Sequence, residues 1–216
     1  MDNQQLENLR QDYSANSLDL KDVLVNPIDQ FKTWFQEAEK AQILEPNAMI
    51  LGTVDSNGQV SQRTVLLKGL SEKGFVWYTN YESAKGADLL ENPKASLLFL
   101  WLDLQRQVRI EGFTRKTDRA SSLKYFQSRP RGSQIGAWAS PQSKVIRDRK
   151  TLESNVVAME KKFKSTNQLP LPPHWGGYVL EPIKMEFWQG RSSRLHDRIA
   201  YHRKKVNDWY SVRLAP

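Results

Sequence analysis

Cysteine is absent from this chain of 216 residues, which excludes disulfide bonds, thiolate nucleophiles and sulfur-ligated zinc. Histidine is scarce, and His174, His196 and His202 form no spaced ligand motif, so we expect no metal site. No apolar run approaches the roughly 20 residues that span a membrane, and the polar N-terminus has no apolar signal core. These absences predict a cytoplasmic protein that binds no metal.

Glycine-rich nucleotide-binding motifs are also missing, because the chain has neither a dinucleotide fingerprint nor a Walker sequence. Acidic residues are fewer than basic ones, 24 against 32, which gives a net charge of +8. This balance favours an anionic partner such as nucleic acid, anionic lipid or a phosphorylated small molecule. The length and an apolar share of 39% predict one globular domain with a substantial core.

The spacing of apolar residues alternates between helical and strand periods along the chain. Helices are predicted over about 4–13, 27–43, 83–92, 117–128 and 145–164. Strands are predicted over about 48–54, 59–68, 74–79, 94–101, 105–111, 176–188, 197–203 and 208–213. Short antiparallel strands with helices inserted between them predict an α+β fold, mainly antiparallel β, that forms a barrel in a single domain over residues 1–216.

The most informative segment runs from 187 to 198 near the C-terminus. If it is extended, Arg194, His196 and Arg198 project from the same face of the strand. Three potential cations on one face repel one another unless an anion lies among them, and arginine suits bidentate recognition of phosphate or carboxylate. A histidine between two arginines is expected to be neutral, able to hydrogen-bond or to move a proton. The alternative is a solvated edge strand whose charges oppose aggregation.

A second cluster surrounds the end of the helix predicted over 117–128. Tyr125 and Arg129 are four residues apart and share a helix face, and Ser133 follows in an expected loop. A phenol, a guanidinium and a hydroxyl together supply donors that can surround a phosphate. Taken alone, the cluster is better explained by a helix-capping arginine and a turn serine.

Further candidate anion ligands are Arg63, Lys68, Lys85 and the polar loop at 140–143. Arg63 and Lys68 are five positions apart, so joint action requires a bulge or two ligands. Lys85 lies in the first turn of a predicted helix, where free N–H groups favour an anion. The donors exceed what one phosphate can use, which predicts two phosphorylated ligands or one ligand with two phosphates.

Several strings match a known family in order and spacing. They include 62–68, 78–80, 125–131 and 133–138, then Phe-Trp-Gln-Gly at 187–190, Arg-Leu-His-Asp-Arg at 194–198 and the terminal Arg-Leu-Ala-Pro at 213–216. On these motifs the sequence resembles the pyridoxamine 5′-phosphate oxidase family over nearly the whole chain. The resemblance implies an FMN-binding split β-barrel with inserted helices, in a homodimer with FMN at the subunit interface. It also implies oxidation of pyridoxamine 5′-phosphate and pyridoxine 5′-phosphate to pyridoxal 5′-phosphate by dioxygen, with release of hydrogen peroxide, in cofactor biosynthesis.

The resemblance also implies roles for individual residues. Arg194 and His196 are the expected catalytic residues, over the pyridine ring. Residues 1–25 resemble a mobile arm that closes over the substrate. The implied FMN contacts are Arg63, Thr64, Val65, Leu66, Leu67, Lys68, Tyr78, Thr79, Lys85, Gln107, Gln142, Ser143, Trp188 and Arg198. The implied substrate contacts are Arg10, Tyr13, Lys68, Tyr125, Arg129, Ser133, Arg194, Leu195 and His196.

One position departs from the family pattern, and two other functions compete with the one above. Ala84 stands where the family often carries a basic residue, so the resemblance does not extend to the FMN-phosphate contact at that position. The first rival is a split-barrel flavin reductase that uses a nicotinamide donor, against which the cluster at Tyr125, Arg129 and Ser133 argues. The second is a non-catalytic protein that binds nucleic acid, for which the net charge is the sole support.

Overall fold

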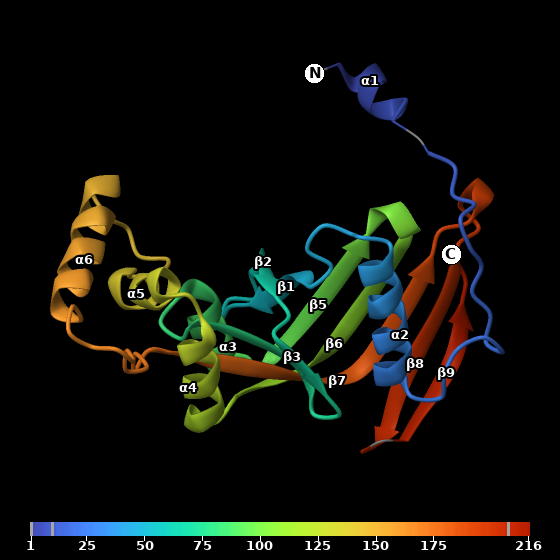
Figure 1. Cartoon of the computed structure of the whole chain (residues 1–216). Coiled ribbons are helices and arrows are strands. Elements are labelled where there is room, and N and C mark those ends of the chain that lie inside the picture. The colour runs from blue at the N-terminus through green and yellow to red at the C-terminus, as the bar shows by residue number, and fades with distance from the viewer. Residues whose placement is uncertain (1, 10, 207) are drawn as a thin grey trace. The chain divides into compact units, whose positions relative to one another are not determined.

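A computed structural model describes residues 2–9, 11–206 and 208–216 (Figure 1). The helices are α1 (Asn3–Glu7), α2 (Pro27–Lys40), α3 (Ala84–Glu91), α4 (Arg119–Ser128), α5 (Arg131–Ala139) and α6 (Arg149–Lys162), with single 3₁₀ turns η1 (Leu102–Leu104) and η2 (Ser192–Arg194). The strands are β1 (Ala48–Val54), β2 (Val60–Leu66), β3 (Gly69–Ser71), β4 (Gly74–Asn80), β5 (Lys94–Trp101), β6 (Arg106–Lys116), β7 (Trp175–Gln189), β8 (Asp197–Lys205) and β9 (Asp208–Leu214).

The strands pair in the order β2-β1-β5-β6-β7-β4-β3, and β8 joins β7 and β9. The pairs β3–β4, β4–β7, β7–β8 and β8–β9 are antiparallel. This confirms the expected α+β class with mainly antiparallel strands. The chain divides into two compact units, the first made of Met1–Ile50, Leu97–Glu111 and Pro182–Pro216, and the second of Leu51–Ser96 and Gly112–Glu181. No helix in the described residues has the length and apolarity needed to cross a membrane.

In the first unit, α2 is built as its sequence predicts. The Asn26 side chain caps the helix by accepting from the N–H of Ile28 at 2.9 Å, and Pro27 occupies the first turn. Phe31 and Trp34 are buried and pack against Phe99 and Phe187, with ring centroids 4.8 and 5.2 Å apart. The helix ends at Lys40, three residues before the predicted end.

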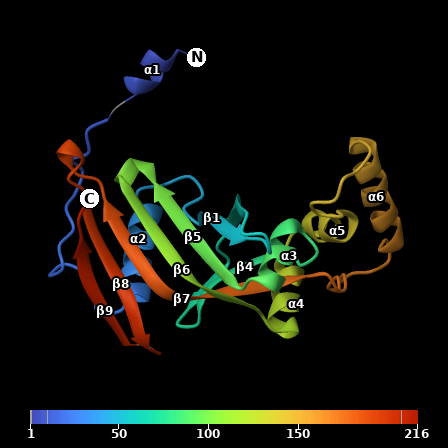
Figure 2. The same ribbon diagram turned by 180° about the vertical axis from the view of Figure 1, so that it is seen from behind.

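In the second unit, β4 pairs with the first half of β7, and helices that surround the candidate site pack near these strands. Figure 2 shows α3, α4 and α5 close to the beginning of β7. Tyr78 pairs with Gly177 across these strands, and a Cβ on Gly177 would lie 2.8 Å from the Tyr78 ring. Phe126, Ile135 and Trp175 form a core cluster with residues from the α6 region. The cluster fixes α4 and α5 against the start of β7.

Two expectations were wrong. Ser133 lies in the first turn of α5, not in a loop, because Pro130 ends α4 and Arg131 begins a new helix directly. The segment from Arg194 to Arg198 is not one extended strand either. Arg194 ends the 3₁₀ turn η2 with a φ of 60°, and β8 begins only at Asp197, so the alternation of side chains does not hold there.

Candidate active site

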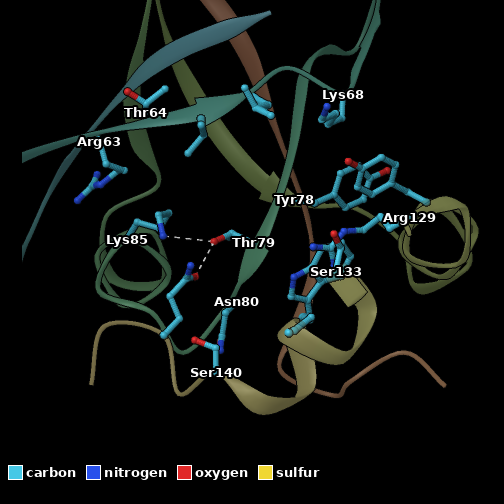
Figure 3. A pocket seen from close by; sticks show the side chains of 17 residues that line it. Arg63, Thr64, Lys68, Tyr78, Thr79, Asn80, Lys85, Arg129, Ser133 and Ser140 are labelled. Carbon is cyan, nitrogen blue, oxygen red and sulfur yellow. Dashed lines mark hydrogen bonds between the residues drawn. The ribbon is translucent and has the colours of Figure 1, made fainter. Parts of the chain in front are cut away.

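A cavity of about 650 Å³ lies within the second unit (Figure 3). It is lined by Arg63, Thr64, Val65, Leu66, Lys68, Tyr78, Thr79, Asn80, Lys85, Tyr125, Arg129, Ser133, Gly136, Ala137, Ser140, Gln142 and Trp175. Among these described lining residues there are four Lys or Arg side chains and no carboxylate. The cationic lining is suited to a ligand with more than one negative charge.

The cations fall into two groups. Figure 3 shows Arg63 and Lys85 on one side of the cavity and Lys68 with Arg129 on the other. Both Arg63 and Lys68 line the cavity, and Lys68 lies beyond the end of β2 at Leu66, where the alternation of a strand no longer applies. The five-residue spacing therefore needs no bulge. We call the two groups the Lys85 end and the Arg129 end.

At the Lys85 end, the ammonium group is buried and contacts only hydroxyl oxygens among the described residues. Lys85 Nζ lies 3.3 Å from Thr79 Oγ1 and 3.3 Å from Ser83 Oγ. Thr79 Oγ1 also donates to Gln142 Oε1 at 3.2 Å. Burial lowers the pKa of Lys85, and the neighbouring positive charge of Arg63 lowers it further. The negative charge of a bound phosphate would oppose both effects.

The start of α3 adds backbone donors at this end. Ser83 precedes the helix, but its hydroxyl donates to the Asn80 carbonyl at 2.7 Å and caps no N–H of the first turn. Gly86 brings the turn close to the chain before it, since a Cβ there would lie 2.1 Å from the Tyr81 carbonyl oxygen. An uncapped helix N-terminus beside a buried lysine favours a phosphate group.

Arg63 contributes to the same end from β2. Its Nη1 donates to Thr53 Oγ1 at 2.6 Å, and its Nη2 lies 3.7 Å from Asp88 Oδ2. Burial lowers the pKa of Arg63, while Asp88 opposes that shift. Asp88 also raises the pKa of Lys85, but by less than burial and Arg63 lower it.

At the Arg129 end, the guanidinium is oriented without a carboxylate. Arg129 is the C-cap of α4, and its Nη1 is buried with no hydrogen-bond partner within the described part of the chain. Gln134 Nε2 donates to the Arg129 carbonyl at 2.7 Å and holds the backbone. Burial lowers the pKa of Arg129 and raises that of Tyr125, so the Tyr125 phenol stays protonated as a donor at neutral pH. An unpartnered cationic nitrogen in this wall fits an anionic ligand.

The residues expected over the pyridine ring belong to the first unit. Tyr13, Arg194 and His196 line a cavity of about 530 Å³ there. The His196 ring lies 4.5 Å from the Trp188 ring and 6.0 Å from the Tyr13 ring. Arg194 is exposed, with its backbone in the left-handed region.

A backbone hydrogen bond sets the tautomer of His196. The N–H of Arg191 donates to His196 Nδ1 at 3.1 Å. Nδ1 must therefore carry a lone pair, and the proton of the neutral ring is on Nε2. His196 would therefore donate a hydrogen bond from Nε2 to a bound ligand.

Arg198 is not a free cation as the strand pattern had suggested. Its Nε and Nη2 donate to the two carboxylate oxygens of Glu186 at 2.9 and 3.2 Å, and Glu186 is buried. Asp197 likewise forms ion pairs with Arg191 at 3.2 Å and with Arg213 at 2.7 Å. Of the three candidate cations on the expected strand, only Arg198 has a carboxylate partner among the described residues.

The remaining expected residues have varied positions. Leu67 and Ser143 do not line the first cavity, although their neighbours do, and Ser143 has a φ of 70°. Gln107 and Trp188 lie on β6 and β7 in the first unit, and Leu195 is exposed. Arg10 lies outside the described residues. Ser140, from the polar loop at 140–143, also lines the first cavity, as do Gly136, Ala137 and Trp175, which sequence reasoning missed.

Comparisons with known proteins identify a family that spans most of the chain. Residues 35–163 match the family model described as pyridoxamine 5′-phosphate oxidase, and residues 175–216 match its C-terminal dimerisation region. The chain is 51% identical over 212 residues to the pyridoxine/pyridoxamine 5′-phosphate oxidase of Salinibacter ruber, covering 98% of this chain and 99% of that protein. It is 55% identical over 214 residues to the protein of the same name from Paraburkholderia xenovorans, with the same coverage.

Solved structures show the same fold. The crystal structure of PhzG from Burkholderia lata, in complex with tetrahydrophenazine-1-carboxylic acid, has a TM-score of 0.86 at 32% identity, covering 94% of this chain and 100% of that one. An FMN binding protein from Nostoc punctiforme has a TM-score of 0.68 at 17% identity, over 86% and 97% of the two chains. The fold is the FMN-binding split barrel of flavin-dependent oxidoreductases. The chain belongs to the pyridoxine/pyridoxamine 5′-phosphate oxidase family, whose enzymes use FMN.

Proposed function

We propose that this protein oxidises pyridoxamine 5′-phosphate and pyridoxine 5′-phosphate to pyridoxal 5′-phosphate. Dioxygen is the final acceptor, hydrogen peroxide is released, and the amine substrate also yields ammonia. The observation that carries the proposal is the cavity with two separate sets of phosphate donors and no lining carboxylate in the described residues. One phosphorylated ligand would use each set, and both enzyme substrate and FMN are phosphate monoesters.

The Lys85 end is proposed to hold the FMN phosphate, with Arg63 and Gln142 beside Lys85. The β2 backbone from Thr64 to Leu66 would form the wall beside the flavin ring. FMN, when bound, supplies the acceptor for the two electrons and the hydrogen that leave the substrate. The protein's own contribution at this end is to fix the phosphate and thereby the position of the ring.

The Arg129 end is proposed to hold the substrate phosphate, through Lys68, Tyr125, Arg129 and Ser133. Holding a small substrate at its phosphate limits its freedom over the flavin, and such positioning can lower a barrier by up to ~7–11 kcal/mol. The same contacts would select against a substrate that lacks the phosphate. Such a substrate would leave the buried Nη1 of Arg129 without a hydrogen-bond partner.

Arg194 and His196, in the first unit, are proposed to act on the pyridine ring of the substrate. Arg194 would fix the ring and its substituent, and His196 would donate a hydrogen bond from Nε2. Gln107, Trp188 and Arg198 are proposed as further FMN contacts, in a homodimer that binds FMN at the subunit interface. The match of residues 175–216 to a dimerisation region supports the dimer, and this region includes Trp188, Arg194 and Arg198.

The tautomer of His196 gives a prediction. If the ring acts as an Nε2 donor, His196→Gln keeps an amide N–H near that position, and we expect kcat within about threefold of wild type. His196→Leu removes the donor, and a lost hydrogen bond corresponds to roughly a tenfold decrease in kcat. Steady-state kinetics with pyridoxine 5′-phosphate measures both. A glutamine variant as impaired as the leucine variant contradicts the assignment.

The function itself is tested by spectroscopy of the purified protein. We expect the absorption spectrum of oxidised flavin, bleached by pyridoxamine 5′-phosphate under anaerobic conditions and restored by air with release of peroxide. Bleaching by NADH but not by pyridoxamine 5′-phosphate would instead indicate the flavin reductase. A colourless protein that does not take up FMN and binds oligonucleotides with a steep salt dependence would indicate the nucleic-acid-binding protein.

A further inference from the structure

Trp175 forms part of the cavity wall, although no sequence motif singled it out. The residue opens β7 and is 6% exposed. Its ring packs against Phe126 in the core cluster, with centroids 5.4 Å apart in an edge-to-face arrangement. It also borders the cavity together with Tyr125 and Arg129. Trp175 therefore connects the core of the second unit to the Arg129 end.

The Arg129 guanidinium lies over the Trp175 ring. Its central carbon is 4.8 Å from the ring centroid, within the range of a cation–π contact. The rings of Tyr78 and Tyr125 are nearly parallel to that of Trp175, with interplanar angles of 10° and 7° and centroid distances of 5.5 and 6.2 Å. Arg129 thus lies over one ring of a set of three nearly parallel aromatic side chains.

This arrangement orients a cation without neutralising it. A carboxylate partner, such as Glu186 provides for Arg198, fixes a guanidinium but consumes its donors and its charge. The face of an aromatic ring accepts no conventional hydrogen bond, and Arg129 Nη1 has no partner within the described part of the chain. An aromatic support leaves the guanidinium donors available for a ligand.

The backbone of Trp175 is itself fixed by another arginine. Arg119 Nη1 donates to the Trp175 carbonyl at 2.8 Å, and Arg119 Nη2 donates to the Pro172 carbonyl at 3.2 Å. Because the ring is also buried and packed against Phe126, it has little freedom to move away from Arg129. From these contacts we propose that Trp175 is the positioning residue of the substrate-phosphate site, holding the Arg129 guanidinium in its phosphate-binding orientation. The inference rests on the function proposed above and deepens it at one subsite.

The test measures equilibrium binding of pyridoxal 5′-phosphate to the FMN-loaded enzyme by titration calorimetry. A cation–π contact in a desolvated wall corresponds to about a 5- to 30-fold change in affinity. We therefore expect Trp175→Leu to raise the dissociation constant, and the KM for pyridoxamine 5′-phosphate, by about that factor. Trp175→Phe, which keeps a ring, should stay within about threefold, and the FMN dissociation constant should be unchanged in both variants.

Trp138→Leu is the matched control. Trp138 packs in the same cluster against Phe163, at 5.3 Å, but does not line the cavity. We expect it to lower the melting temperature while leaving pyridoxal 5′-phosphate binding unchanged. A purely structural role for Trp175 predicts the same pattern, a lower melting temperature with unchanged affinity, and that result would overturn the inference.

A double-mutant cycle separates action through Arg129 from direct contact with the ligand. On the Arg129→Ala background, Trp175→Leu should weaken binding by less than about twofold. An undiminished effect on that background also overturns the inference. Since binding is measured without turnover, the outcome is independent of the proposed reaction. An enzyme that fails to oxidise pyridoxamine 5′-phosphate would refute the function, whereas normal oxidation with unaltered Trp175→Leu binding would refute only the role of Trp175.

Discussion

Replacing Lys85 with methionine will stabilise the FMN-free protein and weaken FMN binding by about 10- to 100-fold. The buried ammonium has two hydroxyl contacts at 3.3 Å and the like charge of Arg63 nearby. A charge-assisted hydrogen bond to a phosphate contributes ~1.5–3 kcal/mol, which gives the loss in FMN affinity. Removing an incompletely satisfied buried charge saves about 1–3 kcal/mol, or roughly 2–10 °C in melting temperature for a chain of this length.

The same substitution will change how stability depends on pH. Folding lowers the pKa of Lys85 below its usual value of 10.5, so the unfolded chain binds more protons than the FMN-free native protein. Stability contributed by this group therefore rises as the pH increases from the lowered pKa towards 10.5. Thermal melts of the FMN-free wild type in alkaline buffers should show this slope, and Lys85→Met should lack that part of it.

Lys94→Met is the control for Lys85→Met. Lys94 is exposed at the beginning of β5 and does not line the cavity. We expect neither its FMN affinity nor its melting temperature to differ appreciably from wild type. Fluorescence titration with FMN and thermal melts of the FMN-free proteins compare wild type, Lys85→Met and Lys94→Met in FMN affinity and melting temperature. A less stable Lys85→Met protein that binds FMN normally would show that Lys85 is a structural residue.

Replacing Arg129 with alanine will raise the KM for pyridoxamine 5′-phosphate by about 10- to 100-fold, with kcat within a few-fold of wild type. The guanidinium has a buried nitrogen that lacks a partner within the described residues, so a phosphate supplies the missing acceptor. Because Arg129 belongs to the end of the cavity away from Lys85, the FMN affinity should not change (Figure 3). Initial-rate kinetics and FMN titration measure the two quantities.

Lys124→Ala provides the comparison on the same helix. Lys124 is an exposed cation of α4 that does not line the cavity, so we expect unaltered kinetics. A general electrostatic attraction of the substrate would instead make the two variants similar, and both effects would fall with added salt. An Arg129→Ala enzyme with a wild-type KM would exclude Arg129 from the substrate-phosphate site.

Much of the Arg129 end could be predicted from the sequence because it depends on local spacing. Tyr125 and Arg129 are four residues apart on a helix whose end is marked by Pro130, and both line the cavity as expected. Ser133 was correctly paired with them, but its helix was missed. Gly132 and Gly136 weaken the helical signal of α5, which is stabilised by burial of Ile135 in the core cluster.

The features that escaped prediction depend on contacts between distant parts of the chain. In the sequence, Trp175 follows a proline-rich loop and has no feature that distinguishes it from a core tryptophan. Its contact with Arg129 at the end of α4 becomes evident only in the fold. The turn at Arg194 is fixed by the bond from the Arg191 N–H to His196 and by the commitment of Asp197 to Arg213. Alternating side chains in the sequence indicated an extended strand, and these tertiary bonds override that pattern.

The central claim is that one cavity binds two phosphate monoesters at opposite ends. A crystal structure of the protein with both FMN and pyridoxal 5′-phosphate bound tests it most directly. The account predicts one phosphate in contact with Lys85 and Arg63, and a second in contact with Arg129 and Ser133, with the pyridine facing the flavin between them. A single occupied anion site in this cavity, or a pyridoxal phosphate bound away from Arg129, would contradict it.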